Sequence, residues 1–404
     1  MFVKNKLASR APYPADLREI MNLERAAESR EWLSQWKLLN PEPTPLVFMK
    51  GIADKLKLGT ILIKDESKRS PLGSFKALGA SIALVRLILR KFPDAGFTAK
   101  SLFAGDHARQ LKDFTVVSAT AGNHGCSLAA AARDIGCRCV IVLSSQVNPD
   151  REKAIAAQGA QIVRVEGDYD DSVEHAESLS RTEGWLVVSD TSYDGYEEIP
   201  RDVMQGYATI PAEAIEQLGA ADKAESPFTH VFLQGGVGGM AAGLAAYLWE
   251  RYGKLRPTMI AVEPDQADCL YQSAVAGHAA SASGSIDSVM AGLACGETSP
   301  LAWRFLQPSV DFFMTVADDT AIDAMKLLAF GKYGDTPIVS GGSGAAGLAA
   351  LIQLANDPAL RSEVGLNESS RVLLINTEGA TAPTDYLNQV GKTAEDVLKA
   401  AAEA

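Results

Sequence analysis

The feature that most constrains the fold of this chain is a repeated alternation of apolar runs and alanine-rich segments. Most apolar runs are continuous, which is typical of strands covered on both faces, as in a parallel sheet. They occupy residues 60–66, 114–120, 139–145, 161–167, 185–191, 230–236, 259–265 and 371–379. Alanine-rich segments that predict helices lie between these runs, at residues 74–92, 125–136, 149–159 and 238–253. This order predicts an α/β protein built from strand–helix–strand units with right-handed crossovers.

Composition narrows the class of partner. The 404 residues suit two or three domains or one large α/β unit, and the formal net charge of −12 argues against nucleic acid or an anionic membrane as main partner. Five cysteines are too few for a disulfide scaffold, and the five histidines show no metal-binding spacing. The N-terminal segment has no signal-peptide core, and no apolar run has the length of a membrane helix. We therefore expect a cytoplasmic enzyme that uses no metal.

A turn that ends in a lysine lies between the first predicted strand and the first long predicted helix. Ser74 is a candidate N-cap, and Lys76 stands just inside the start of the helix. The positive end of the helix dipole disfavours the ammonium form of a lysine there, which suits a neutral, nucleophilic amine. A solvated surface lysine is the structural alternative.

Two further turns offer backbone amides at the start of a helix. The turn at residues 118–125 contains Asn123, which has both a donor and an acceptor, and its amides suit a carboxylate or a phosphate. An ordinary capping turn explains the same residues. The turn at residues 340–347 fits either a second anion site or close helix packing.

A third glycine-rich turn, at residues 235–239, has four glycines in five positions and predicts a phosphate cradle. Gly236, Gly238 and Ala241 also satisfy a dinucleotide-binding pattern, and Glu263 ends the next strand, where a ribose-binding acid belongs. A nicotinamide-dependent dehydrogenase is therefore an alternative from another class.

Taken together, S-F-K at 74–76, G-N-H-G at 122–125 and G-G-V-G-G at 235–239 resemble the fold-type II (tryptophan synthase β-like) pyridoxal-phosphate enzymes. The segment P-T-P-L at 43–46 matches the opening pattern of that family. Longer segments resemble its diaminopropionate-cleaving lyases, namely residues 64–80, 204–210, 229–243, 261–271, 289–297 and 376–379.

The resemblance, which runs from about residue 40 to residue 380, implies an architecture and an activity. The fold is then two open, twisted, mostly parallel sheets flanked by helices, one per domain. Residues 1–85 and 196–404 form the large cofactor-binding domain and residues 86–195 the smaller one. The implied activity is α,β-elimination of 2,3-diaminopropionate to pyruvate and ammonia with pyridoxal 5'-phosphate, by a homodimer. The nearest alternative is a dehydratase or lyase for another β-substituted amino acid. A protein that binds without catalysis is disfavoured by the retained lysine.

The resemblance also assigns roles to single residues. Lys76 carries the cofactor and acts as acid and base, and Asp190 lies near the substrate. The phosphate is held by the backbone of Gly235, Gly236, Val237, Gly238 and Gly239. Asn123 bonds to the ring hydroxyl, and Asn376 or Thr377 lies beside the pyridine nitrogen. The substrate carboxylate is held by the segment Thr120, Ala121, Gly122 and His124.

Three acids of the family pattern are missing here. Ala121, Gly342 and Ala380 stand where the family has Asp, Glu and Asp. The β-substituent of the substrate therefore stays open, and we expect a preference for the L-isomer, because each enantiomer needs a base on its own face. Cys269 and Cys295 are expected to approach each other, close enough for a bridge on oxidation, although two unrelated buried thiols are the alternative.

Overall fold

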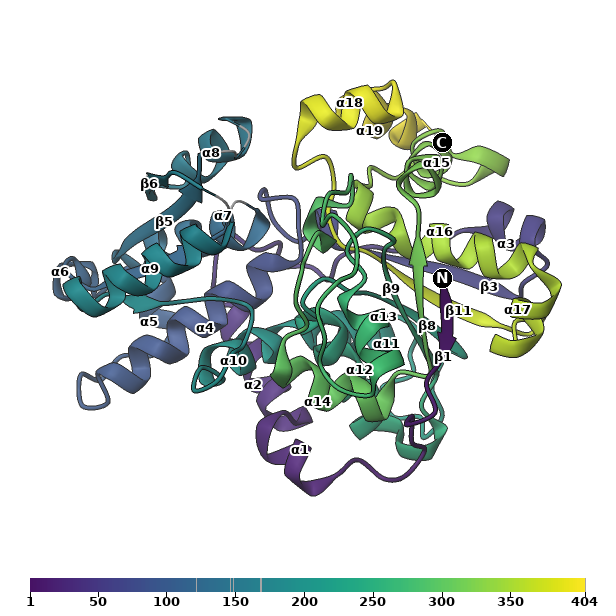
Figure 1. The fold of residues 1–404 in the computed structure, drawn as a ribbon, viewed down its shortest axis with the longest axis horizontal. Coiled ribbons are helices and arrows are strands. Elements are labelled where there is room, and N and C mark those ends of the chain that lie inside the picture. Colours follow the sequence, from purple (N-terminus) through teal and green to yellow (C-terminus); the bar gives the residue numbers. More distant parts are fainter. Residues whose placement is uncertain (121, 146, 148, 168, 404) are drawn as a thin grey trace.

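The computed structural model describes residues 1–120, 122–145, 147, 149–167 and 169–403. These residues form two sheets, each flanked by helices, and the predicted α/β class with two mostly parallel sheets is confirmed (Figure 1).

The larger sheet has seven strands in the order β1-β10-β9-β8-β11-β3-β2. The two short edge strands, β1 and β2, run antiparallel to their neighbours, and all other pairs are parallel. The strands are β1 (Phe2–Lys4), β2 (Leu46–Phe48), β3 (Thr60–Asp65), β8 (His230–Gln234), β9 (Thr258–Pro264), β10 (Phe312–Val316) and β11 (Arg371–Asn376).

The smaller sheet has four parallel strands in the order β6-β5-β4-β7. They are β4 (Thr115–Ala119), β5 (Arg138–Ser144), β6 (Gln161–Val165) and β7 (Leu186–Val187). All four come from one continuous stretch of chain, whereas the larger sheet takes strands from both sides of it. The domain boundaries at residues 85/86 and 195/196 stay a prediction.

The helices cover both sheets and carry most of the buried alanine and leucine. Those around the smaller sheet and the cleft are α4 (Lys76–Lys91), α5 (Ala99–Phe103), α6 (Ala108–Leu111), α7 (Asn123–Ile135), α8 (Pro149–Ala156), α9 (Tyr169–Glu183) and α10 (Glu198–Tyr207). The others are α1 (Ala15–Ile20), α2 (Leu23–Leu33), α3 (Lys50–Leu56), α11 (Thr209–Gln217), α12 (Gly239–Tyr252), α13 (Cys269–Ala276), α14 (Pro300–Ser309), α15 (Asp318–Ala329), α16 (Gly342–Asn356), α17 (Pro358–Val364), α18 (Pro383–Val390) and α19 (Ala394–Glu403). In the described part of the chain, no helix combines the length and hydropathy of a membrane crossing.

All eight predicted strands are present, but the sequence missed three others. β1 and β2 have only three residues each and depend on pairing with a neighbour at the sheet edge. β10 is fully buried, but its apolar residues were not separated from the helices on either side in the sequence. The run at 185–191 shrinks to the two residues of β7, because the chain then leaves the sheet toward the cleft.

The glycine and lysine turns meet because they follow parallel strands. The carboxyl ends of parallel strands lie at one edge of a sheet, where ligands bind in open α/β folds. In the larger sheet β3, β8 and β11 lead into the Lys76 turn, the 235–239 loop and the 376–379 segment. In the smaller sheet β4 leads into the turn that contains Asn123.

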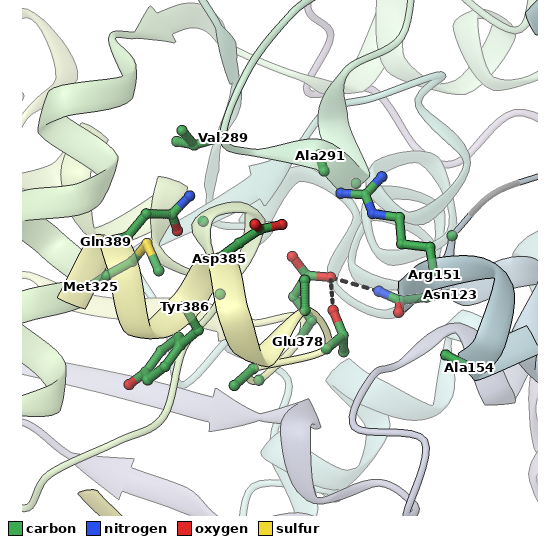
Figure 2. A pocket seen from close by; sticks show the side chains of 18 of the residues that line it. Asn123, Arg151, Ala154, Val289, Ala291, Met325, Glu378, Asp385, Tyr386 and Gln389 are labelled. Atoms are coloured by element: carbon green, nitrogen blue, oxygen red, sulfur yellow. Dashed lines mark hydrogen bonds between the residues drawn. The ribbon is translucent and has the colours of Figure 1, made fainter. Parts of the chain in front are cut away.

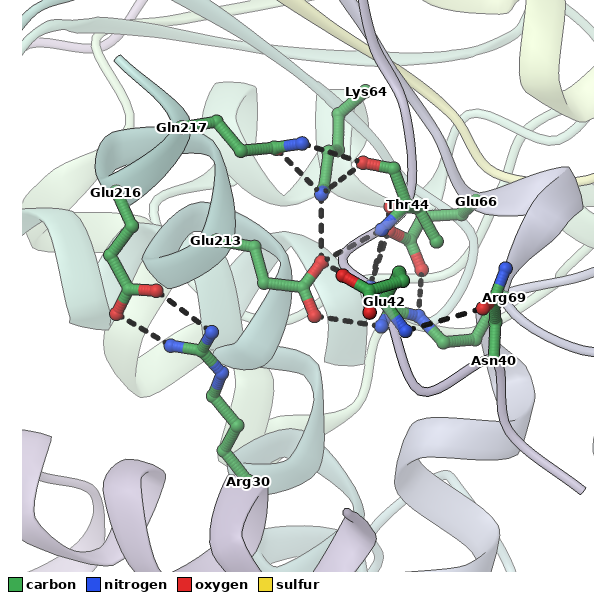
Figure 3. A network of polar contacts seen from close by, with 10 residues as sticks. All are labelled: Arg30, Asn40, Glu42, Thr44, Lys64, Glu66, Arg69, Glu213, Glu216 and Gln217. Carbon is green, nitrogen blue, oxygen red and sulfur yellow. Dashed lines mark hydrogen bonds and ion pairs between the residues drawn. The ribbon is translucent and has the colours of Figure 1, made fainter. Parts of the chain in front are cut away.

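A buried network of ionic groups anchors the chain ahead of the Lys76 turn (Figure 3). Arg69 binds the carboxylates of Glu66 and Glu213 with both ends of its guanidinium, at 2.8–2.9 Å. Lys64 Nζ donates to Glu213 Oε2 and to the carbonyl of Thr44, both at 2.7 Å. The two positive and two negative charges cancel, so the buried cluster has no net charge. Its hydrogen bonds connect β3 and the turn after it to α11.

Candidate active site

Lys76 and Asp190 form an ion pair at the cleft between the two sheets. Their side chains stay 19% and 23% exposed, so neither is fully removed from solvent. Burial alone disfavours the ammonium form, but the Asp190 charge outweighs it and raises the pKa of Lys76 above its usual value. The expectation that the helix start disfavours the ammonium form is therefore wrong for this state of the site, because a carboxylate faces the amine.

Ser74 does not cap the helix of Lys76. The cap residue is Phe75, which makes no side-chain capping bond, and the buried Ser74 hydroxyl has no partner in the described part of the chain. The backbone of Ser74 instead pairs with Glu378, and the Phe75 N–H donates to the carbonyl of Thr377 at 3.1 Å. Tertiary pairing with the segment after β11 therefore replaces the local cap.

His124 lies behind Asp190 and is oriented by the backbone. Its Nε2 lies 2.9 Å from the carbonyl oxygen of Val188, so Nε2 carries the proton in that hydrogen bond. Its Nδ1 is buried, has no hydrogen-bond partner among the residues that the structure describes, and lies 3.8 Å from Asp190 Oδ2. Burial raises the pKa of Asp190, but Lys76 and then His124 overcome this and hold it below its ordinary range.

The turn before α7 approaches the cleft from the smaller sheet. Gly122 caps the helix, and its N–H lies 3.4 Å from the Thr120 hydroxyl that accepts from it. Asn123 Nδ2 donates to Glu378 Oε2 at 2.6 Å, which joins the two sides of the cleft. Ala121 lies outside the described residues.

The loop at residues 235–239 requires its glycines. Gly236 and Gly238 have φ values of +64° and +99°, a region that favours glycine. A Cβ on Gly235 would lie 2.4 Å from Glu263 Cγ, and one on Gly238 would lie 2.9 Å from Leu306 Cδ1. The N–H groups of Gly236 and Gly238 donate to no residue that the structure describes, so they are free for a ligand.

Two details of this loop differ from expectation. The Gly235 N–H donates to the carbonyl of Val262 at 2.8 Å, so it is not free for a phosphate. Glu263 is buried and accepts from the N–H groups of Leu270 and Tyr271, both at 2.8 Å, which caps α13. Burial raises the pKa of Glu263 to about 8. The acid that the dinucleotide pattern needs for a ribose is therefore occupied by the protein itself.

Asn376 and Thr377 end β11 and are both buried. Asn376 Nδ2 donates to Asp65 Oδ1 at 2.7 Å and to the carbonyl of Val339 at 2.9 Å, whereas its Oδ1 has no hydrogen-bond partner among the described residues. A Cβ on Gly344 would lie 2.2 Å from that Oδ1 and 2.7 Å from Ser340 Oγ. These contacts support the close-packing interpretation of the turn at 340–347, whose first residue, Ser340, is fully buried.

A cavity of about 140 Å³ opens beside these residues (Figure 2). Gly122 and Asn123 line it from α7, Arg151 from α8, and Asp385 from α18. The carboxylate of Glu378 lies between them in Figure 2. Sequence reasoning quoted Glu378 only within a motif and missed Arg151 and Asp385, because no local pattern marks residues that meet across a cleft.

The two cysteines singled out from the sequence are free thiols. Cys269 Sγ donates to the carbonyl of Gly236 at 3.4 Å, and Cys295 Sγ lies 3.5 Å from the Cβ position of the same glycine. Burial raises the pKa of the Cys295 thiol to about 11, so it is neutral at physiological pH. Both thiols flank the glycine loop, and their bridging on oxidation stays a prediction.

The fold and this site define a class of enzyme that uses pyridoxal phosphate. The sequence model of the family described as pyridoxal-phosphate dependent enzyme matches residues 38–378, and the chain belongs to this family. The residues fit the cofactor, since the glycine loop adjoins the Lys76–Asp190 pair, with the Cβ position of Gly239 3.5 Å from the Asp190 carbonyl oxygen. The end of β11 adjoins the same lysine, because the Phe75 N–H donates to the carbonyl of Thr377 at 3.1 Å. The nicotinamide alternative is excluded.

Within that family the chain belongs with the diaminopropionate ammonia-lyases. It is 38% identical to the enzyme of that name from Salmonella typhimurium over 361 residues, which covers 87% of this chain and 88% of that one. The holo diaminopropionate ammonia-lyase of Escherichia coli superposes with a TM-score of 0.86 at 34% identity, over 96% of both chains. The Escherichia coli enzyme in complex with D-serine gives 0.85 at 34% identity, over 98% of both chains.

Proposed function

We propose that this protein is a pyridoxal-phosphate-dependent diaminopropionate ammonia-lyase. The reaction converts 2,3-diaminopropionate and water to pyruvate and two ammonia. The observation that carries the proposal is the Lys76–Asp190 pair, which faces the cleft together with a glycine loop whose free N–H groups suit a phosphate. The relatives that bear this name extend over nearly the whole chain, which supports the same activity here.

Residues that follow strands of both sheets would bind the cofactor and the substrate. The N–H groups of Gly236, Gly238 and the first turn of α12 would hold the phosphate, with Val237 and Gly239 shaping the loop. Asn123 would bind the ring hydroxyl and Asn376 or Thr377 would lie beside the ring nitrogen. The amides of residues 120–124 would bind the substrate carboxylate at the start of α7.

Proton transfer falls to Lys76 and Asp190. When bound, pyridoxal phosphate supplies an electron sink for the α-carbon. The Asp190 carboxylate stabilises positive charge on the Lys76 nitrogen, which is the atom that would carry the cofactor. Once a substrate amine displaces Lys76, either Lys76 or Asp190 is within reach to accept the α-proton. Buried His124, held by the Val188 carbonyl, limits how far Asp190 can turn.

The stereochemical preference remains part of the proposal. Asp190 and Lys76 form one contacting pair, and Ala121 cannot take a proton from the other face of the substrate. We expect L-2,3-diaminopropionate to be turned over about 10²–10⁴-fold faster than the D-isomer, the range of a missing general base. Ala121→Asp should restore part of the D-activity.

The test is keto-acid release from purified protein with L- and D-2,3-diaminopropionate, and with L-serine and L-threonine as competing substrates. Release from L-diaminopropionate with a high kcat/KM supports the proposal. Greater release from a hydroxy amino acid would favour the dehydratase alternative. Light scattering of the same sample tests the proposed homodimer, which a mass of one subunit would refute.

A further inference from the structure

Glu378 is a buried carboxylate that forms no ion pair with the residues that the structure describes. It is 9% exposed, and its oxygens accept from Asn123 Nδ2 at 2.6 Å and from Thr381 Oγ1 at 3.4 Å. Arg151, on α8, is the cation among the described residues that line the same cavity, and it forms no ion pair with Glu378. A carboxylate removed from water without a countercharge costs free energy, which a bound cation would recover.

The backbone holds this carboxylate rigidly in the cavity. Glu378 pairs with Ser74 next to the Lys76 turn, and its carbonyl accepts from the Gly341 N–H at 3.0 Å. The next residue, Gly379, donates to the carbonyl of Gly73 at 2.9 Å. A Cβ on Gly341 would lie 3.0 Å from Glu378 Oε1, so the glycine leaves this oxygen space.

The other acids around the cleft are already engaged. Asp190 pairs with Lys76, Asp65 binds Ser67 and Asn376, and Glu263 caps α13. Gly342 and Ala380 line the cavity and bring no charge to it. Asp385, on α18, is the other carboxylate among the described residues that line the cavity.

We propose that Glu378 determines specificity by binding the β-ammonium group of a diamino acid substrate. The inference rests on the proposed function and names the group that recognises the second amine. Gly122 and Asn123 line the same cavity, and the backbone of Glu378 pairs with Ser74 in the Lys76 turn, so a substrate held by its carboxylate at the start of α7 would bring its side chain toward Glu378.

The same contact assists the leaving group. A neighbouring carboxylate favours the protonated form of an amine. When the bond between the β-carbon and nitrogen breaks, its electron pair stays on the nitrogen, and a protonated amine therefore leaves as neutral ammonia. The α-carbon supplies the electron pair of the new carbon–carbon double bond after its proton has been removed.

The first test measures binding to the holoenzyme by calorimetry. The ligand pair is 2-methyl-2,3-diaminopropionate and 2-aminoisobutyrate, which lack an α-proton and differ by the β-amine. We expect the diamino ligand to bind the wild type tighter by about 10- to 100-fold, the range of a charge-assisted hydrogen bond. Glu378→Gln should bring this ratio close to one, whereas Glu378→Asp should keep part of it.

The matched control is Asp385→Asn, which removes a carboxylate from the same cavity and should change the ratio by less than about threefold. A second measurement compares the KM of L-2,3-diaminopropionate with the inhibition constant of L-alanine, which has no β-amine. In Glu378→Gln the KM of L-2,3-diaminopropionate should rise at least about tenfold, whereas the inhibition constant of L-alanine should stay nearly unchanged.

If Glu378→Gln changed the dissociation constants of both ligands equally, the assignment of Glu378 would be overturned. The same holds if Asp385→Asn lowered the ratio of the two constants as much as Glu378→Gln does. If the wild type releases keto acid from diaminopropionate while Glu378→Gln retains its selectivity, only this inference fails. If the wild type does not release keto acid from diaminopropionate at all, the proposed function itself fails.

Discussion

Replacing Arg69 with methionine should destabilise the fold much more than removing a surface ion pair. The guanidinium is buried and makes five hydrogen bonds, two to Glu66, two to Glu213 and one to Thr44. Methionine keeps much of the side-chain volume but leaves Lys64 alone with two buried carboxylates. Removing one partner of a buried ion pair costs about 3–5 kcal/mol, because a charge then stays uncompensated.

The assay is urea unfolding followed by tryptophan fluorescence, with the free energy taken from the midpoint and the slope. The control is Arg30→Met. Arg30 and Glu216 form an ion pair of 2.6 Å, but their side chains are 31% and 47% exposed, so we expect a loss below about 1 kcal/mol. A similarly small loss of stability in Arg69→Met would refute the view that the buried carboxylates of this cluster depend on Arg69 for charge compensation.

The same network predicts a dependence on pH. Burial by itself raises the pKa of Glu213, but Arg69 and Lys64 outweigh it and lower the pKa below its usual value. A carboxylate whose folded pKa is depressed contributes stability above its unfolded pKa, about 4.3, and loses it as pH falls through the folded pKa. The difference in the free energy of unfolding between wild type and Arg69→Met should therefore become smaller below about pH 4.

Three further substitutions test the active site. Lys76→Ala should abolish the borohydride-sensitive visible absorbance of the bound cofactor together with keto-acid release, and retention of both would remove the cofactor assignment. Asp190→Asn should keep the cofactor but lower kcat by about 10²–10⁴-fold, so unchanged turnover would show that Lys76 suffices as base. Gly238→Ala places a side chain at a φ of +99° and 2.9 Å from Leu306 Cδ1, and should weaken cofactor binding in a fluorescence titration of the apoenzyme. Wild-type affinity in that variant would mean that the loop is not the phosphate site.

Several features of the fold follow from local sequence. Continuous apolar runs such as residues 60–66 and 230–236 form strands wherever both faces are covered, and alanine-rich segments between them form helices. The tight turn at Gly236 and Gly238 can also be predicted from the sequence, because glycine adopts the positive φ that such a turn needs. The α/β class followed from these local patterns, whereas the cofactor followed from the resemblance of the lysine, asparagine and glycine turns to the fold-type II enzymes.

Other features depended on neighbours that are distant in the chain. Ser74 has the sequence of a helix cap, yet its backbone pairs with Glu378, about three hundred positions later, and its hydroxyl caps nothing. The helix start at Lys76 predicts a neutral amine, whereas Asp190, brought in from the smaller sheet, keeps it charged. Glu263 has the position of a ribose-binding acid in the sequence, but in the fold it caps α13. Local sequence sets which conformations a backbone can adopt, while the protonation state and the availability of a side chain depend on the charges, donors and solvent that the tertiary structure brings to it.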